Sequence, residues 1–325
     1  MLYNLLAILT GFALLIWSAD RFILGAAATA RNLKISPLVI GITVVGFGTS
    51  APEMLVSAIA SLDGSPGLAV GNALGSNITN IALVLGVAAL IKPLDVHSRL
   101  LKKELPVLIV AMLIALLLVQ DNHLGLSDGL VLLSMLFLVM WWITREALNN
   151  RGIDPMQAEY EEELPPDMPV PRALFWLLLG LALLLLSSKI LVWGAVNVAT
   201  SFGVSELIIG LTIVALGTSL PELAATVASA LKNEHDIAIG NIVGSNLFNI
   251  LAVFGIPGLL APSWLDSGVL ERDFPIVFVL TVALVVMAYG FKKPGRINRI
   301  EGGILLMSFF AYQALLYYTV TRALL

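Results

Sequence analysis

Long apolar segments separated by short polar stretches follow one another along the whole chain. Apolar segments of roughly 17–25 residues are long enough to cross a bilayer as helices. We predict spanning helices over the approximate ranges 2–30, 36–62, 68–91, 104–119, 127–143, 173–198, 205–231, 237–260, 273–289 and 300–320. A polar segment over residues 145–171, rich in Glu and Pro, is predicted to be a solvated linker. The pattern therefore predicts an all-α integral membrane protein with ten transmembrane helices, in which residues 1–144 and 172–325 form two five-helix units.

Composition agrees with this pattern and narrows the chemistry. Of 325 residues, 58% are hydrophobic and 12% are charged, whereas a soluble domain carries about 25% charged residues. Cysteine is absent and the three histidines lie in predicted loops, so thiol chemistry and soft-metal sites lack ligands in the helices. Any ion held in the apolar core would be bound by oxygen. The first apolar segment has no positively charged leader and no small-residue cleavage site, and we interpret it as a spanning helix.

An internal repeat dominates the sequence. Residues 41–81 align with residues 210–250 without a gap at an offset of 169, and 17 of the 41 paired positions are identical. Each copy carries G-T-S-x-P-E followed by G-N-x-x-G-S-N-x-x-N. An internal repeat of this kind indicates that the fold is built from two related units. Here it contains the carboxylates that lie deepest inside apolar sequence.

Basic residues indicate the orientation of the helices. If the N-terminus lies outside, 14 of the 18 Lys and Arg residues fall in inner loops. The positive-inside rule then places both termini outside and the acidic linker in the cytoplasm. Five helices per unit is an odd number, so the second unit enters the membrane upside down relative to the first. Inverted repeats with interrupted helices are typical of secondary transporters, whose ion sites lie near the membrane midplane.

Glu53 and Glu222 lie about halfway along the second and seventh predicted helices. An ionised group at the bilayer centre costs at least about 2.5–3.5 kcal/mol, which makes it a functional candidate. A cation bound between them would offset the charge of both carboxylates and so explain their matched positions. Glycines and the prolines preceding each Glu are predicted to interrupt both helices and free backbone oxygens. Hydroxyl groups three and four residues earlier share the face of each Glu: Thr49, Ser50, Thr218 and Ser219.

A second polar stripe follows the third and eighth helices at intervals of four residues. Its members are Asn72, Ser76 and Asn80 in the first copy, and Asn241, Ser245 and Asn249 in the second. Small-residue pairs, Gly71 with Gly75 and Gly240 with Gly244, predict close approach of another helix. Carboxylate, hydroxyl, amide and carbonyl oxygens together suit a hard cation such as Ca²⁺. Asn77 and Asn246 lie off the stripe, and we predict structural hydrogen bonds for them.

At these motifs the chain resembles the cation/Ca²⁺ exchanger superfamily, specifically prokaryotic Na⁺/Ca²⁺ exchanger-like membrane proteins. GTSAPE with GNALGSNITN, and GTSLPE with GNIVGSNLFN, resemble that family's two alpha-repeats. The resemblance implies a Na⁺/Ca²⁺ exchanger fold, and alternating access in which Na⁺ entry drives Ca²⁺ export. It also implies an ion-binding set: side chains of Glu53, Glu222, Ser50, Ser219, Ser76, Ser245 and Asn80, with backbone oxygens of Gly46, Thr49, Ala215 and Thr218.

One position departs from the family pattern. Several family members carry an acidic residue where this chain has Asn249, which we keep in the candidate set. Two ionised glutamates balance one Ca²⁺ or two Na⁺, while three Na⁺ would leave the site at +1. The counter-ion therefore stays open between Na⁺ and H⁺. Two carboxylates close together in a low dielectric are expected to share a proton, so that protons compete with Ca²⁺.

The sequence also allows alternatives to a Na⁺-driven Ca²⁺ exporter. The nearest is an antiporter that exchanges Ca²⁺ for H⁺, or one that carries another divalent cation. An intramembrane hydrolase lacks paired catalytic aspartates or a His ligand in its helices, so no enzyme is expected, and inverted interrupted helices favour a carrier over a channel. We expect inorganic cations and the bilayer of the inner membrane as partners, with no cofactor, nucleic acid or obligatory protein partner. Asp20 and Arg21 are predicted to neutralise each other; Lys189 occupies the position matching Asp20.

Overall fold

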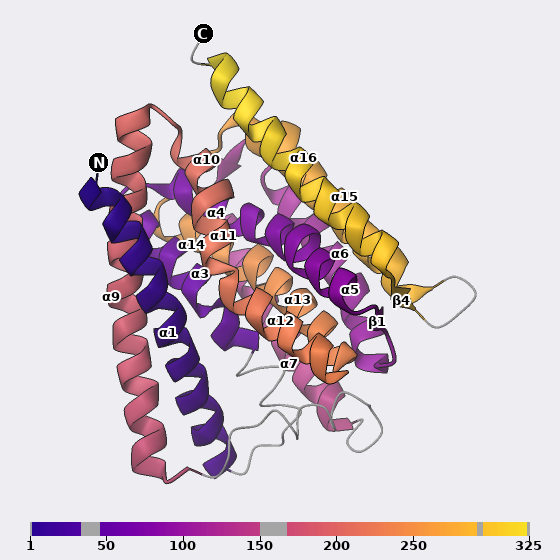
Figure 1. Ribbon diagram of the computed structural model, residues 1–325. Coiled ribbons are helices and arrows are strands. Elements are labelled where there is room, and N and C mark those ends of the chain that lie inside the picture. The colour runs from indigo at the N-terminus through magenta and orange to yellow at the C-terminus, as the bar shows by residue number, and fades with distance from the viewer. Residues whose placement is uncertain (1, 34–45, 150–167, 291–294, 324–325) are drawn as a thin grey trace.

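The computed structural model describes residues 2–33, 46–149, 168–290 and 295–323, and these are almost wholly helical (Figure 1). Before the linker the α-helices are α1 (Leu2–Asn32), α3 (Gly46–Leu62), α4 (Pro66–Ile78), α5 (Gly86–Ile91), α6 (Arg99–Leu118) and α7 (Leu126–Asn149). After it they are α9 (Val170–Phe202), α10 (Glu206–Ile209), α11 (Ala215–Thr218), α12 (Leu220–Lys232), α13 (His235–Phe248), α14 (Gly255–Leu260), α15 (Phe274–Tyr289) and α16 (Arg299–Ala323). The helical fold predicted from the sequence is confirmed.

Short π-helical turns interrupt several of these helices. They are η2 (Thr79–Leu85), η3 (Gly210–Val214), η4 (Asn249–Val253) and η5 (Val269–Asp273). η2 joins α4 to α5, and η4 lies between α13 and α14. Since η4 begins at Asn249, which matches Asn80 in η2, both polar stripes end in a π-helical turn. Such turns occur often at functional sites.

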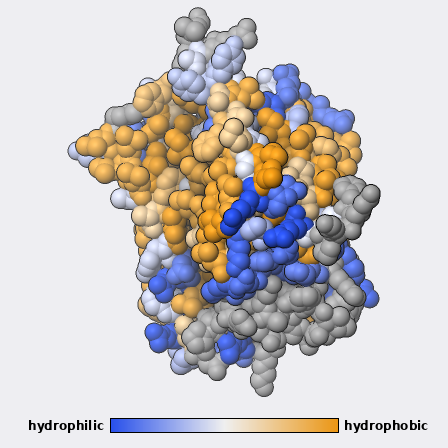
Figure 2. All heavy atoms as spheres, turned by 45° about the vertical axis from the view of Figure 1, so that its right-hand side comes forward, coloured by the Kyte–Doolittle hydropathy of each residue, from blue (hydrophilic) through white to orange (hydrophobic). Residues whose placement is uncertain are grey.

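Six helices are long and apolar enough to cross a membrane, and a bent pair, Glu206–Thr218 with Leu220–Lys232, makes a seventh. Three predicted spans contain a helix that does not meet this criterion within the described residues: α3, α6 and α15. Residues 36–45 of the second predicted span lie outside the described residues. Large apolar side chains such as Tyr3, Phe137 and Met307 are exposed on the outer helices. On the face in Figure 2, hydrophobic residues form a broad band and hydrophilic residues gather towards its lower part. The chain is a membrane protein.

Two predicted features need correction. The linker was placed from residue 145, but α7 continues to Asn149 and α9 starts at Val170; the segment 150–167 lies outside the described residues. The predicted interruption of the second helix at Gly48 and Pro52 is wrong, because α3 runs through both residues. A proline is tolerated inside a membrane helix where neighbouring groups satisfy the freed backbone.

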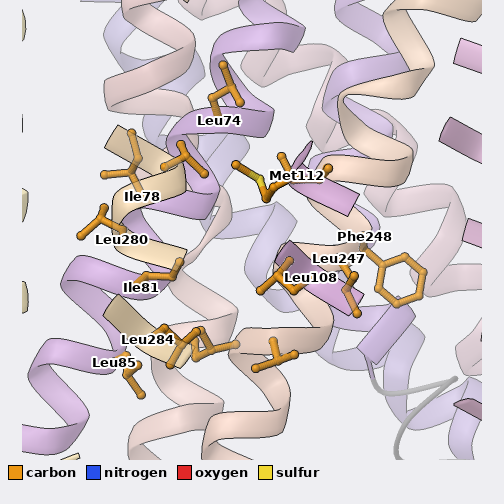
Figure 3. Packing of buried hydrophobic residues seen from close by; sticks show 14 of the residues in the cluster. Leu74, Ile78, Ile81, Leu85, Leu108, Met112, Leu247, Phe248, Leu280 and Leu284 are labelled. Atoms are coloured by element: carbon orange, nitrogen blue, oxygen red, sulfur yellow. The ribbon is translucent and has the colours of Figure 1, made fainter. Parts of the chain in front are cut away.

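The most buried spans are α4 to α5 and α13 to α14, which cross the centre of the molecule. One face of α4 and η2 is apolar: Leu74, Ile78, Ile81 and Leu85. Figure 3 shows these side chains gathered with residues of α6, α13 and α15, among them Leu108, Leu247 and Leu284. Burial of this face leaves the polar stripe, on the other side of the same helix, directed away from the apolar cluster.

The periphery is formed by long helices. In Figure 1, α1 and α9 lie side by side along one side of the molecule, and α15 and α16 lie along the other. Arg21 of α1 pairs with Asp20 (Nη2 to Oδ2, 3.6 Å) and stacks over the rings of Trp17 and Trp176 at 5.7 and 5.3 Å. The predicted mutual neutralisation of Asp20 and Arg21 is thereby confirmed.

Two antiparallel ribbons connect loops from before and after the linker. β1 (Leu94–Asp95) pairs with β4 (Arg296–Ile297), and β2 (His123–Leu124) pairs with β3 (Ser263–Trp264). In the second ribbon, the ring of His123 meets that of Trp264 edge to face at 5.0 Å. Each ribbon is only two residues long, but each ties together segments that are far apart in sequence.

Candidate ion-binding site

Glu53 and Glu222 are carried by two helices that differ in shape. Glu53 lies within the continuous helix α3, one residue after Pro52. Glu222 lies in the first turn of α12, just after a bend of 42° at Ser219 that separates α12 from α11. Pro221 suits the start of α12, since the first turn of a helix has no backbone bond for a proline to remove. The broken helix predicted from the sequence is therefore found in the second copy.

Both carboxyl groups are fully buried, with an exposed fraction of 0%. Among the described residues, both oxygens of Glu53 and Oε2 of Glu222 have no hydrogen-bond partner. Glu222 Oε1 accepts a hydrogen bond from Ser245 Oγ at 3.3 Å. Buried oxygens without a protein donor are costly, and a bound cation is the kind of ligand that would satisfy them.

Two asparagines brace the site in matched ways. Asn72 Nδ2 donates to the backbone carbonyl of Glu53 at 3.2 Å, and Asn72 Oδ1 accepts from Thr218 Oγ1 at 3.2 Å. Asn241, its counterpart, donates to the carbonyl of Glu222 at 3.4 Å and accepts from Thr49 Oγ1 at 3.4 Å. Each asparagine thus joins the glutamate of its own copy to the threonine of the other.

The remaining predicted side chains are also buried around these groups. Five of these predicted ligands carry a side-chain oxygen that has no hydrogen-bond partner among the described residues: Ser50, Ser219, Ser76, Asn80 and Asn249. The Thr49 and Ser245 hydroxyls lie 3.4 Å apart. Thr49 Oγ1 also lies 3.2 Å from the carbonyl oxygen of Gly46, and Thr218 Oγ1 lies 3.4 Å from that of Ala215. Two of the four backbone oxygens that the resemblance implies, those of Gly46 and Ala215, therefore contact a hydroxyl.

Glycines bring the central helices together. A Cβ added at Gly71 would lie 2.3 Å from the carbonyl oxygen of Leu207, and one at Gly75 would lie 2.7 Å from Leu211 Cα. The predicted close approach at this pair is confirmed, because only glycine leaves room for α10 and η3. Gly244 has nothing within 4 Å among the described residues. By the offset of 169, the counterpart of Leu211 is residue 42, which lies outside the described part.

Two matched hydroxyl residues were missed by the sequence analysis. Ser57 Oγ donates to the carbonyl of Val253 at 2.7 Å, and Thr226 Oγ1 accepts from Asn241 Nδ2 at 3.0 Å. Both lie four residues after the glutamate of their own copy, hence on the same helix face. That spacing, together with the offset of 169, was the signal that could have revealed them.

The donor set has a defined charge. Within the described ranges, no group of three or more His, Cys, Asp or Glu side chains is arranged to hold a metal ion. The candidate ligands for a cation are therefore two carboxylates together with neutral hydroxyl, amide and carbonyl oxygens. Oxygen donors of this kind suit hard cations and do not suit soft ones.

Comparison with known families agrees with this geometry. The family model described as sodium/calcium exchanger protein matches residues 3–145 and 172–318. The chain belongs to this family. The resemblance seen in the two motifs is thus confirmed, and the residues that the family model leaves unmatched between its two parts lie in the predicted linker.

Several relatives of this exchanger family member are similar over nearly their full length. The putative antiporter CaxA of Alkalimonas amylolytica is 51% identical over 98% of this chain and 99% of its own. The inner membrane protein YrbG of Escherichia coli is 39% identical over 96% of both chains. A solved structure of the sodium-calcium exchanger NCX_Mj has a TM-score of 0.66 at 31% identity and covers 97% of this chain and 99% of that one. The relatives named by activity are transporters, so the prediction that the chain is not an enzyme is confirmed.

Proposed function

We propose that the protein is a secondary antiporter that exports Ca²⁺ in exchange for Na⁺, with the ion bound in mid-membrane between Glu53 and Glu222. The observation that carries the proposal is the pair of fully buried carboxyl groups with three oxygens that lack a partner among the described residues. Two negative charges match one Ca²⁺ or two Na⁺. The site can therefore hold either one Ca²⁺ or two Na⁺ with the same total charge, but not both cargoes at once. An exchanger requires such mutually exclusive binding.

The full ligand set extends this pair. We assign side-chain oxygens of Ser50, Ser219, Ser76, Ser245, Asn80 and Asn249 to it, with backbone oxygens of Gly46, Thr49, Ala215 and Thr218. Support comes from the complete or nearly complete burial of these side chains and from the unpartnered oxygens on most of them. Ca²⁺ takes six to eight oxygens at about 2.3–2.6 Å, so different subsets can serve Ca²⁺ and Na⁺.

The architecture that we propose is two inverted five-helix repeats, one ending with α7 and the other starting with α9, joined by a cytoplasmic linker. The offset of 169 supports it, because it relates not only residues but also contacts: Asn72 to Glu53 recurs as Asn241 to Glu222. The start of α1 and the end of α16 also lie at the same end of the molecule in Figure 1, as an even number of crossings requires. The distribution of basic residues supports an orientation with that end outside the cell.

Flux measurements test the ion pair. Reconstituted protein is expected to take up radioactive Ca²⁺ when an outward Na⁺ gradient is imposed, and Glu53→Gln or Glu222→Gln is expected to abolish the flux nearly completely. Glu271→Gln, which removes an exposed carboxylate, serves as the matched control and should transport normally. Gradient-driven flux that survives in both buried variants would reject the site.

The counter-ion is tested in the same vesicles. A Na⁺ gradient at equal pH should drive Ca²⁺ movement, whereas a pH gradient without Na⁺ should not. The opposite result would assign the protein as a H⁺/Ca²⁺ antiporter, since the same two carboxylates can exchange Ca²⁺ for protons. Replacing Ca²⁺ by another divalent cation in these assays defines the cargo.

A further inference from the structure

Asn80 poses a problem of orientation that a carboxylate does not. An amide has one acceptor oxygen and one NH₂ group, and only the oxygen can bind a cation. A carboxylate presents an oxygen whichever way it is turned. An asparagine that contributes to a cation site therefore needs a neighbour that holds the NH₂ group away from the ion.

Asn246 is placed to be that neighbour. Asn80 Nδ2 donates a hydrogen bond to Asn246 Oδ1 at 3.3 Å, and both residues are buried, with exposed fractions of 0% and 1%. The other end of the amide, Asn80 Oδ1, has no partner among the described residues. As long as Asn246 presents its Oδ1, turning the Asn80 amide round would bring two oxygens face to face and lose the hydrogen bond.

The free oxygen of Asn80 belongs to the stripe that reaches the glutamates. Asn80 follows Asn72 and Ser76 at intervals of four residues on one helix, and Asn72 contacts the carbonyl of Glu53. The turn η2, which carries Asn80, also packs against α12, which carries Glu222. Asn246 follows the stripe residue Ser245 on α13 and therefore lies next to the stripe, where it contacts Asn80.

The matching hydrogen bond between Asn249 and Asn77 is absent from the described part of the structure. Asn77 matches Asn246 and Asn249 matches Asn80 at the offset of 169. Among the described residues, neither nitrogen nor oxygen of Asn77 or of Asn249 has a hydrogen-bond partner. The two copies therefore differ at this point: the amide of Asn80 is fixed by Asn246, whereas that of Asn249 has no such hydrogen bond.

We propose that Asn246 is a positioning residue for cation binding, which turns the amide oxygen of Asn80 towards a hard divalent cation at the glutamate pair. The proposal rests on the function proposed above. In this role Asn246 does not touch the ion. It acts by fixing the orientation of Asn80, which does. The proposal also predicts that Asn246 and its repeat counterpart Asn77 are not equivalent.

Equilibrium binding of Ca²⁺ to the purified full-length protein tests this role, with Asn77→Leu as the matched control. Asn246→Leu removes the acceptor at similar volume and should raise the half-saturating Ca²⁺ concentration about tenfold, the effect of one lost orienting hydrogen bond. Asn77→Leu, at the matched position, should change it by less than about threefold. Equal effects of the two substitutions would overturn the proposal.

A double substitution separates positioning from simple loss of structure. In an Asn80→Asp background either oxygen can face the ion, so adding Asn246→Leu should change the half-saturating concentration less than about twofold. A structural role would leave the tenfold effect of Asn246→Leu unchanged in that background. Asn246→Asp keeps the acceptor oxygen and should bind Ca²⁺ at least as tightly as the unsubstituted protein, which keeps the test valid if Asn246→Leu misfolds. Tenfold weaker binding by Asn246→Asp would also overturn the proposal.

The outcome for the unsubstituted protein distinguishes the two proposals. If it binds no Ca²⁺, both the proposed function and the role of Asn246 fail. If it binds Ca²⁺ with equal losses in the two leucine variants, only the role of Asn246 fails.

Discussion

Thr218 donates a hydrogen bond to Asn72 at 3.2 Å, although the two residues are 146 positions apart in the sequence. Asn72 in turn donates to the backbone carbonyl of Glu53. The backbone of one buried glutamate is therefore held by a side chain that is itself held from the other copy of the repeat. Asn241 makes the corresponding contacts with Glu222 and Thr49.

Removing this brace should weaken ion binding more than it weakens the fold. Thr218→Val keeps the shape but deletes the donor, and a hydrogen bond of this type contributes about 0.5–1.5 kcal/mol. The half-saturating Ca²⁺ concentration in flux assays is expected to rise about two- to tenfold. Thr212→Val, which loses only a bond to the carbonyl of Ile208 within its own segment, is the control. A larger effect at Thr212 than at Thr218 would contradict the brace.

Acidification should weaken Ca²⁺ binding. Two fully buried carboxyl groups bind protons in competition with a cation, so a metal that displaces protons binds less tightly as the pH falls. If one proton leaves per Ca²⁺ bound, the half-saturating Ca²⁺ concentration rises about tenfold per pH unit over the range where the pair titrates. Equilibrium binding at several pH values, without any gradient, measures this. A constant affinity from mildly acidic to alkaline pH would count against the competition.

Gly71→Ala should destabilise the protein. The new Cβ would lie 2.3 Å from the backbone oxygen of Leu207, and such overpacking costs about 1–3 kcal/mol. Gly303→Ala on α16 is the control, because its Cβ would meet only Leu90 Cδ2 at 3.9 Å. Thermal unfolding in detergent should show a lower midpoint for the first variant and an unchanged or higher one for the second. Equal midpoints would show that α4 and α10 can separate freely.

Tyr312→Phe should lower stability without abolishing transport. Tyr312 Oη donates to Asp273 Oδ1 at 2.9 Å, and Arg272 holds the same carboxyl group through contacts of 2.7 and 3.0 Å. A hydrogen bond to a charged group contributes about 1.5–3 kcal/mol, and α16 is joined here to the start of α15. Tyr317→Phe, at an exposed position of the same helix, controls for the loss of a hydroxyl. The thermal midpoint and the Ca²⁺ flux are measured together.

The sequence predicted the helical fold, and it singled out the two glutamates that the structure buries, because the repeat marks both. Glu53 and Glu222 stood out as carboxylates in apolar segments, and their matched positions singled them out together. The stripe Asn72, Ser76 and Asn80 followed from the spacing of a helix. All of these features depend on residue type and interval, which a sequence contains directly.

Features that depend on three-dimensional packing escaped prediction. The π-helical turns at Asn80 and Asn249 contain no residue type that marks them, and they follow from how the backbone fits its neighbours. Pro52 and Pro221 lie in matching G-T-S-x-P-E motifs, yet α3 is continuous through Pro52 while the other helix bends before Pro221. Hydrogen bonds between the two copies, such as that from Thr218 to Asn72, could not be foreseen without knowing which faces meet.

The ribbons β1 with β4 and β2 with β3 have a consequence for biogenesis. Each takes one strand from before the linker and one from after it, so the earlier part of the chain leaves the ribosome with two unpaired edges. Those edges gain their hydrogen bonds only after the later helices have been inserted. Both ribbons therefore need the second part of the chain, and a chain truncated after α7 could form neither of them.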